Sequence, residues 1–270
     1  MEKLLTIRDF SKLTGLESST LRYWDDIGLF YPAKRDTDTN YRYYAPNQMI
    51  AVKFINVLSE LNTPLKTIAE IESKKNPENL MNLIYQQEKL LDKQMLRLRE
   101  QYAILHTRRE LINLGMNVDE RQLAVCRLEQ RAFIPGPRNE WRQGEEFYRP
   151  FARFCKKAED LRINLHFPVG AAHDSFEAFE REPGQPDYFF SLDPAGNRFQ
   201  EAGEYLVGYT RGYYGQFGDF PQRMKAHIEE HALSVTGPVY AVYLHDELCM
   251  KDPSQYLAQV SVAVSGKHRH

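Results

Sequence analysis

Residues 19–36 have the sequence STLRYWDDIGLFYPAKRD. The first half of this stretch is predicted to form a short helix that ends at Gly28, with Ser18 or Ser19 as its N-terminal cap. An earlier helix is predicted in IRDFSKL, residues 7–13, with Thr6 as its cap. Only about four residues lie between the two helices. This spacing is typical of a helix-turn-helix.

The turn residues around these helices support the same interpretation. Asp9 lies three residues after Thr6, close to the spacing of a capping box. Gly15 follows the first helix, where a glycine commonly terminates a helix. The following stretch FYPAKRDTDTNYRYY, residues 30–44, contains turn-forming residues between two short β-prone pieces. It therefore predicts a β-hairpin, or wing.

The remaining part of residues 1–75 is predicted to be helical. Pro46 opens an amphipathic helix. Its apolar positions are Ile50, Val52, Phe54, Ile55 and Leu58. Asn62 and Thr63 interrupt this helix, and Pro64 begins a further short one.

Residues 79–114 are predicted to form one long helix, about 50 Å in length, that ends at Gly115. Apolar residues recur every seven positions along it, which is typical of a coiled-coil seam. The seam positions are Ile84, Leu91, Leu98, Leu105 and Ile112. We expect these residues to form a homodimer; the alternative is packing against the C-terminal part of the same chain.

Residues 116–267 are predicted to form a separate α+β domain, after the helix-turn-helix domain (1–75) and the long helix (76–115). The order strand–helix–strand–strand occurs twice. The predicted strands are 121–128, 165–172 and 188–192 in the first unit, and 205–210, 239–245 and 256–264 in the second; the helices are 147–158 and 220–232. Two such units predict helices on one side of an antiparallel sheet.

Composition limits the class of protein. A chain of 270 residues with 42% hydrophobic residues can form about two domains with real cores. It contains no long apolar run and no secretory signal, and three widely spaced cysteines fit a reducing cytoplasm. The net charge of −2 means that a nucleic-acid site must be a local basic patch. The C-terminal SGKHRH is excluded from the functional argument.

Four motifs occur in order in residues 1–75: LTIRDFSKLTG (5–15), STLRYWDDIGLFYPAKRD (19–36), NYRYY (40–44) and NTPLKTI (62–68). With these motifs the segment closely resembles the MerR family of transcriptional regulators. The resemblance implies that Ser18, Ser19 and Thr20 enter the major groove of DNA, and that Tyr23 and Arg42 hold phosphates. Trp24 stands where many members of the family have a second tyrosine.

Basic and aromatic side chains also alternate at the two places where such a fold touches DNA. The expected DNA-contacting residues are Ser18, Ser19, Thr20, Arg22, Tyr23, Trp24, Lys34, Arg35, Tyr41, Arg42 and Tyr44. The alternative for Tyr23, Trp24, Tyr41 and Tyr44 is that they fill the core of a small domain. Asp25 and Asp26 are expected to cap or pair locally rather than read a base.

The resemblance implies a mechanism of activation. Members of the family act on promoters whose −35 and −10 elements are too far apart, and the inducer-bound dimer bends and underwinds the spacer for RNA polymerase. The expected partners are therefore promoter double-stranded DNA, RNA polymerase, a small-molecule inducer and a second copy of the chain, with no membrane.

The sequence argues against a metal inducer. Residues 79–114 contain no cysteine, and Cys126 stands alone just beyond them. His227 and His231 are four residues apart on one predicted helix, but without further ligands they favour an exposed polar face. We therefore predict neither a metal site nor a cofactor.

The C-terminal domain is similar to the gyrase-inhibitor-like effector domains of multidrug-sensing MerR regulators, on the doubled element order and the stretches YLVGYTRGYYGQF (205–217) and GPVYAVYLH (237–245). This implies a cavity in which aromatic side chains hold a lipophilic, often cationic, compound. The expected ligand-binding residues are Trp141, Phe147, Tyr148, Phe151, Phe189, Tyr209, Tyr214, Tyr240, Tyr243, Glu204 and Glu247. Relatives commonly place a buried glutamate where this chain has Ala241, so Glu204, Asp246 or Glu247 takes that role, or the ligand is neutral.

Two other functions remain open on the sequence. A hydrolase is one, because Tyr243, His245 and Glu247 cluster near one predicted strand end, although no complete catalytic set is evident and we predict no enzyme. A repressor whose C-terminal domain docks a protein is the other, because exposed aromatic residues suit that role too.

Overall fold

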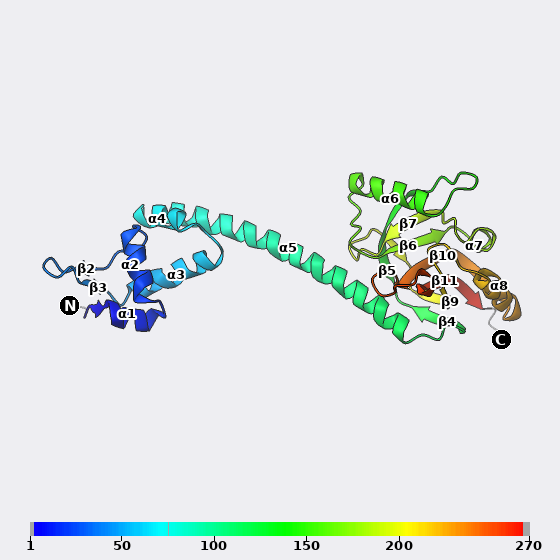
Figure 1. The fold of residues 1–270 in the computed structure, drawn as a ribbon, viewed down its shortest axis with the longest axis horizontal. Helices are drawn as coiled ribbons and strands as arrows, with labels where there is room; N and C mark the ends of the chain where they lie inside the picture. The colour runs from blue at the N-terminus through cyan, green and yellow to red at the C-terminus, as the bar shows by residue number, and fades with distance from the viewer. Residues whose placement is uncertain (1–2, 75, 267–270) are drawn as a thin grey trace. The chain divides into compact units, whose positions relative to one another are not determined.

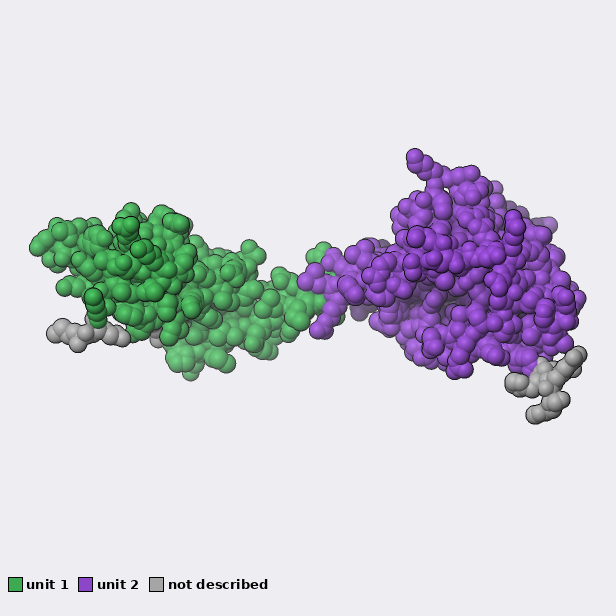
Figure 2. All heavy atoms as spheres, turned by 90° about the horizontal axis from the view of Figure 1, so that it is seen from below, with its two compact units in different colours: residues 1–97 green, residues 98–270 purple. Residues whose placement is uncertain are grey.

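A computed structural model describes residues 3–74 and 76–266, so residues 267–270 of the C-terminal tail lie outside the description. The chain forms two compact units, Met1–Arg97 and Leu98–His270 (Figure 2). Their boundary falls inside the long helix α5 (Pro77–Met116), whereas the predicted division treats this helix as a segment of its own. The division has a simple cause, because Leu83 packs in the core of the first unit and Leu111 in a core of the second.

The first unit is a winged helix-turn-helix, in agreement with the prediction (Figure 1). Its elements are β1 (Leu5–Thr6), α1 (Ile7–Thr14), α2 (Ser18–Asp26), β2 (Lys34–Arg35), β3 (Arg42–Tyr44), α3 (Gln48–Glu60) and α4 (Leu65–Ser73). The wing strands β2 and β3 pair antiparallel, and β1 adds a third strand that the sequence did not predict.

The ends of these helices follow the predicted cap chemistry only in part. Thr6 caps α1, because its hydroxyl accepts a hydrogen bond from the Asp9 N–H at 3.2 Å and donates to the Asp9 carboxylate at 2.7 Å. Gly15 ends α1 with a φ of 75°, a left-handed conformation that glycine adopts without strain. The serine cap of α2 was wrong: Glu17 is the N-cap, without a side-chain hydrogen bond.

An aromatic cluster forms the core of the first unit. Tyr44 stacks on Phe10 with ring centroids 4.6 Å apart, and Phe30 stacks on Tyr44 at 5.9 Å. Trp24 meets Phe30 edge-on at 6.4 Å. All four side chains are buried, so the cluster joins α1, α2 and the wing into one body.

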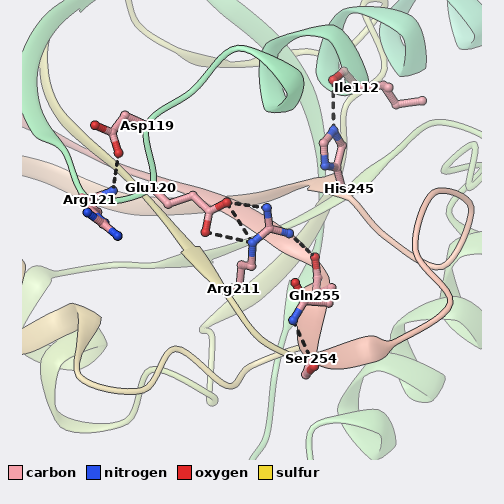
Figure 3. A network of polar contacts seen from close by, with 8 residues as sticks. All are labelled: Ile112, Asp119, Glu120, Arg121, Arg211, His245, Ser254 and Gln255. Carbon is pink, nitrogen blue, oxygen red and sulfur yellow. Dashed lines mark hydrogen bonds and ion pairs between the residues drawn. The ribbon is translucent and has the colours of Figure 1, made fainter.

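Helix α5 extends two residues beyond the predicted range at each end, and Gly115 lies inside it rather than terminating it. The reason is close packing, because a Cβ at Gly115 would lie 2.6 Å from Nε2 of His245. Nε2 of His245 lies 3.1 Å from the Ile112 carbonyl oxygen, and Arg211 donates hydrogen bonds to both Glu120 and Gln255 (Figure 3). The first contact fixes the C-terminal end of α5 to the sheet of the second unit, and the contact of Arg211 with Glu120 fixes the segment that follows α5.

The second unit contains an eight-stranded antiparallel sheet in the order β4-β9-β11-β10-β6-β7-β5-β8. The strands are β4 (Leu123–Leu128), β5 (Arg131–Arg138), β6 (Val169–His173), β7 (Tyr188–Ser191), β8 (Arg198–Gln200), β9 (Gly203–Arg211), β10 (Leu233–His245) and β11 (Leu257–Gly266). The helices are α6 (Tyr148–Asp160), α7 (Phe176–Arg181) and α8 (Phe220–Glu230), and a short 3-10 helix spans Pro253–Gln255.

The doubled element order is confirmed, with one correction. Strands β5, β7 and β6 on one side mirror β9, β11 and β10 on the other, and the halves join where β6 pairs with β10. The first strand of the first unit is therefore β5, not the predicted 121–128, which forms β4 at the edge of the second half. The sequence also missed α7 and β8.

The two faces of this sheet are covered differently. Helices α6, α7 and α8 pack on the face that carries Ala171 and Ala241, which are paired across β6 and β10. Leu111 and Leu114 of α5 pack on the opposite face. The predicted one-sided layer of helices is thus correct for α6–α8, and the end of α5 covers the other side.

Candidate DNA interface and ligand-binding cavity

Helix α2 presents a polar surface to solvent. Ser19, Arg22 and Tyr23 are exposed, and the hydroxyl-bearing Ser18 and Thr20 are half-buried. The opposite side of α2 carries Leu21 and Trp24 into the core, because residues three and four apart share a helix face. The surface therefore offers one guanidinium, one phenol and several hydroxyls, the groups that contact phosphates and base edges.

A buried carboxylate connects α2 to both strands of the wing. The Asp25 side chain is only 2% exposed. It accepts a hydrogen bond from Arg42 Nε at 2.5 Å and a second from Arg35, and Arg42 also reaches Asp26 at 3.1 Å. The hydrogen bond that Arg42 donates to Asp25 raises the pKa of Arg42. The prediction that the two aspartates pair locally is confirmed.

We call the group formed by Asp25, Arg35 and Arg42 the Asp25 clamp, and it changes how the basic residues of the wing are interpreted. Arg35 and Arg42 were predicted to contact DNA, and their guanidiniums are held by Asp25 in this structure. Lys34 and Tyr41 are exposed on the same hairpin. The Tyr41 ring lies 5.4 Å from that of Tyr43.

Two predicted DNA contacts are corrected. Trp24 and Tyr44 lie in the aromatic core, where neither can reach DNA while the unit stays folded. Burial raises the pKa of Tyr44 to about 12, and its hydroxyl has no hydrogen-bond partner among the described residues. The core alternative considered for these two aromatics therefore holds, because so small a unit needs large side chains to form a core.

A cavity of about 290 Å³ lies within the second unit, on the face of the sheet that carries Ala171 and Ala241. These two small side chains are directly paired across the central strands. The residues that line the cavity are Arg108, Phe147, Tyr148, Phe151, Leu165, Phe167, Pro168, Val169, Gly170, Ala171, His173, Pro183, Pro186, Phe189, Tyr213, Tyr214, Gly215, Phe217, Ala241, Tyr243, Asp246 and Glu247.

Aromatic rings form the walls of this cavity. Phe147 stacks against Tyr214 at 6.2 Å, with an interplanar angle of 8°. Phe189 meets the edges of Phe147 and Phe151, both at 5.3 Å. Tyr214 in turn meets Tyr243 at 4.6 Å. Rings at these distances support one another, so they offer preformed apolar and π surfaces to a flat compound.

The structure brings seven of the predicted ligand-binding residues to the cavity: Phe147, Tyr148, Phe151, Phe189, Tyr214, Tyr243 and Glu247. Four others lie outside its lining. Tyr240 and Tyr209 project from the opposite face of the sheet, and Glu204 is exposed on β9. Trp141 donates its indole N–H to the Pro186 carbonyl at 3.0 Å, so it packs behind the wall.

The polar groups at the cavity are few. The Tyr214 hydroxyl donates to the Glu247 carboxylate, and burial together with this carboxylate raises the pKa of Tyr214. Asp246 forms an ion pair with Arg108 at 2.6 Å. Arg108 and His173 also line the cavity and were not predicted. Arg108 belongs to α5, far in sequence from the other lining residues, and His173 is a single histidine outside any motif.

His173 is buried and neutral. Its Nε2 lies 3.2 Å from the Pro183 carbonyl, so this nitrogen carries the proton, and its ring meets Phe179 edge-on. Burial lowers the pKa of His173 to about 4, against smaller opposing effects of Asp187 and Asp174.

This burial predicts an acid-dependent loss of stability. The pKa of His173 is 6.5 when unfolded and about 4 when folded. Between these pH values the unfolded chain binds a proton that the folded chain does not, so stability falls as pH falls from 6.5 to 4, by about 3 kcal/mol. We expect His173→Gln to remove that part of the pH dependence in urea unfolding. His166→Gln, at an exposed histidine, should keep it; equal slopes in both variants would contradict the assignment.

The hydrolase alternative is not supported by the geometry. The Tyr243 hydroxyl accepts from the Gly215 N–H at 3.2 Å and donates to the Tyr213 carbonyl at 3.0 Å. His245 instead contacts Ile112 of α5, and Glu247 is held by Tyr214. Thus the three residues contact different neighbours and form no nucleophile–base pair.

The described residues contain no group of three or more side chains suited to bind a metal ion. His227 and His231 stack with ring centroids 4.0 Å apart on α8. None of the described helices is long and apolar enough to cross a membrane.

The chain is similar to several known proteins. Residues 5–75 match the MerR HTH family regulatory protein family. The multidrug-efflux transporter 2 regulator of Bacillus subtilis (strain 168) is 23% identical over 269 residues, 98% of this chain and 97% of the relative. The multidrug-efflux transporter 1 regulator of the same organism is 39% identical over 71 residues, 26% of each chain. A chain of the cryo-EM structure of the EcmrR–DNA complex in EcmrR-RPo aligns with 97% of this chain and 100% of its own length, at 16% identity and a TM-score of 0.37.

A winged helix-turn-helix joined to a separate domain with an aromatic cavity defines the class of DNA-binding transcriptional regulators. Within that class, residues 5–75 carry a helix-turn-helix of the MerR family, and the chain is similar to regulators of multidrug-efflux transporters. The matching family and these relatives are regulators, not enzymes, as predicted.

Proposed function

We propose that the chain binds promoter DNA as a homodimer and that a small organic compound in the cavity of the second unit controls transcription. The observation that carries this proposal is the aromatic cavity, formed in a chain whose other unit is a winged helix-turn-helix. The relatives that regulate multidrug-efflux transporters support it. α2 and the wing are the proposed DNA surface, with Arg22, Tyr23 and Lys34 as principal contacts.

The DNA surface can be tested without knowing the operator. We expect Arg22→Ala to weaken binding to a labelled duplex by at least about tenfold, because a charge-assisted hydrogen bond to phosphate is lost. The slope of the logarithm of the binding constant against the logarithm of the salt concentration should also become shallower, by the amount that about one lost phosphate contact per protomer predicts. Arg181→Ala removes the same charge from the second unit and should change neither quantity. Equal losses in both variants would show that only net charge matters.

The proposed mode of action is distortion of the promoter. The inducer-bound dimer bends and underwinds an overlong spacer so that RNA polymerase can use both promoter elements, which requires the inducer to favour the distorting conformation. In transcription with purified polymerase, inducer should activate a promoter with the natural spacer and have no such effect once the spacer is shortened to normal length. Activation that ignores spacer length would contradict this mechanism.

The cavity indicates an aromatic, cation-bearing ligand. Stacked rings form its walls, and Glu247 places a carboxylate at its lining. The sheet surface that carries Ala171 and Ala241 forms the floor of the cavity. Because Ala241 has no charge, we expect the ligand cation to lie at Glu247 and not at the floor.

Filling the floor should abolish ligand binding. We expect Ala241→Leu to lower the affinity for aromatic cations at least about hundredfold, because the larger side chain occupies the space between the rings. Calorimetry and Trp141 fluorescence provide the measurement, since Trp141 bonds to Pro186 of the cavity wall. Ala202→Leu, at an exposed position, is the matched control. A wild-type protein that binds no compound from a panel of aromatic cations would contradict the sensor proposal itself.

A further inference from the structure

One residue of the long helix reaches the ligand cavity. Arg108 lies on α5, and within the described chain it is the one α5 residue in the cavity lining. Its Nη1 lies 2.6 Å from Oδ2 of Asp246, which follows strand β10 and also lines the cavity. The side chain of Asp246 is only 11% exposed. A carboxylate so poorly hydrated requires partners, and Asp246 has two: Oδ1 accepts from the Leu248 N–H at 3.0 Å, and Oδ2 has Arg108 as its one cationic partner.

The acidic and basic side chains of the cavity lining are few. Besides His173 they are one guanidinium, Arg108, and two carboxyl groups, Asp246 and Glu247. His173 adds no charge near neutral pH, because burial lowers its pKa to about 4. Since Arg108 neutralises Asp246, Glu247 is left as the one carboxylate without a cationic partner.

Glu247 is placed to meet a ligand cation. The Tyr214 hydroxyl holds its carboxylate, and the ring of Tyr214 stacks on Phe147 within the wall. A cation on a ligand that stacks against these rings would lie close to Glu247. A second cation on the same ligand would meet the Asp246 carboxylate only by displacing Arg108, and would otherwise be repelled by the guanidinium.

We propose that Arg108 is a specificity-determining residue that restricts the cavity to compounds with a single positive charge. This inference rests on the proposed function of the cavity as the inducer site. It assigns to the long helix a direct part in ligand selection, besides its predicted part in dimerisation. Removing the guanidinium exposes a second carboxylate and shifts the preference toward dications.

Two dyes with the same ring system test this proposal. Ethidium carries one positive charge, and propidium adds a second through a side-chain ammonium. Their affinities for the full-length protein without DNA are measured by calorimetry, and the ratio of the two is compared between variants. We expect Arg108→Gln to raise the propidium-to-ethidium affinity ratio at least about tenfold, equivalent to about 1.4 kcal/mol.

The controls separate local from global charge. Arg109→Gln removes the same charge from a side chain that is 67% exposed and paired with Glu110, so its ratio should stay at the wild-type value. The double variant Arg108→Gln/Asp246→Asn restores the net charge of the cavity without an unpaired buried carboxylate, and its ratio should return toward wild type. If Arg108→Gln alone fails to fold, Asp246→Asn alone replaces it in the test. The unpaired Arg108 guanidinium should then weaken the binding of both dyes, and unchanged binding would contradict the proposal.

The outcomes distinguish the two proposals. An equal ratio in Arg108→Gln and Arg109→Gln, with both dyes bound, would overturn the role of Arg108 and leave the sensor cavity intact. If the Ala241→Leu variant bound both dyes with the affinity of the wild type, the dyes would lie outside the cavity. That result would count against the proposed function. Failure of wild type to bind either dye would overturn both.

Discussion

Replacing Leu98 and Leu105 together with lysine is expected to convert the protein to a monomer. The two leucines are 63% and 71% exposed in the single chain, although they continue a seven-residue apolar repeat. In a homodimer four such side chains would leave water, and each contributes about 1.5–3 kcal/mol when fully buried. Lysines at the same positions would remove this contribution and place like charges against each other.

The loss of the dimer should also remove most DNA binding. A symmetric dimer holds two recognition helices at a fixed separation, so a monomer loses the gain that comes from linking two sites. We expect affinity for promoter DNA to fall more than about hundredfold. Sedimentation and light scattering report the oligomeric state, and circular dichroism checks that the fold is retained.

The outcome also decides between the two interpretations of the repeat. Leu98→Met and Leu105→Met keep the apolar surface and should preserve the dimer. Each end of α5 already packs within its own unit, through Leu83 and Leu111, so intramolecular packing accounts for the ends of the repeat but not its middle. A lysine variant that remains dimeric would show that another surface forms the interface.

Asp25→Asn is expected to destabilise the first unit by about 2–3 kcal/mol, a value reduced from that of fully buried pairs because Arg35 is partly exposed. The neutral amide leaves two guanidiniums close together without the carboxylate that balances them. For a unit of this size the melting temperature should fall by about 10 °C or more.

The neighbouring carboxylate provides the control. Asp26 is 66% exposed and meets Arg42 only at the surface, so Asp26→Asn should change stability by less than about 0.5 kcal/mol. Thermal unfolding followed by circular dichroism compares the two variants. Equal stability of both would show that the clamp contributes nothing, and that packing of the aromatic cluster alone holds the wing in place.

Several features of this protein follow from local sequence. Thr6, Asp9 and Gly15 act through their near neighbours along the chain, so the first helix of the helix-turn-helix and its ends are readable from the order of residues. The length of α5 and its apolar repeat are equally local, because a helix needs no distant partner to satisfy its backbone. The doubled strand–helix order was readable for the same reason.

Other features depend on contacts between distant residues. The sequence left Trp24 and Tyr44 open between the DNA surface and the core, and folding brings them against Phe10 and Phe30 in the core. Gly115 has the sequence signature of a helix end, but the ring of His245 makes it a site of close packing inside the helix. Strand pairing also placed β5, and not β4, in the repeated unit.

The ligand cavity shows the same division. Residue type alone identified the aromatic candidates. In the folded sheet, successive side chains of a strand point to opposite faces, so Tyr243 lies on the cavity face and Tyr240 lies on the face covered by α5. Arg108 and Asp246 are far apart in sequence, so no local pattern predicts their ion pair. The sequence by itself determined the helix-turn-helix, the long helix and the aromatic residue types from which the cavity is built. The tertiary structure decided which rings form the cavity and which charged side chains line it, because those properties arise only where separate segments meet.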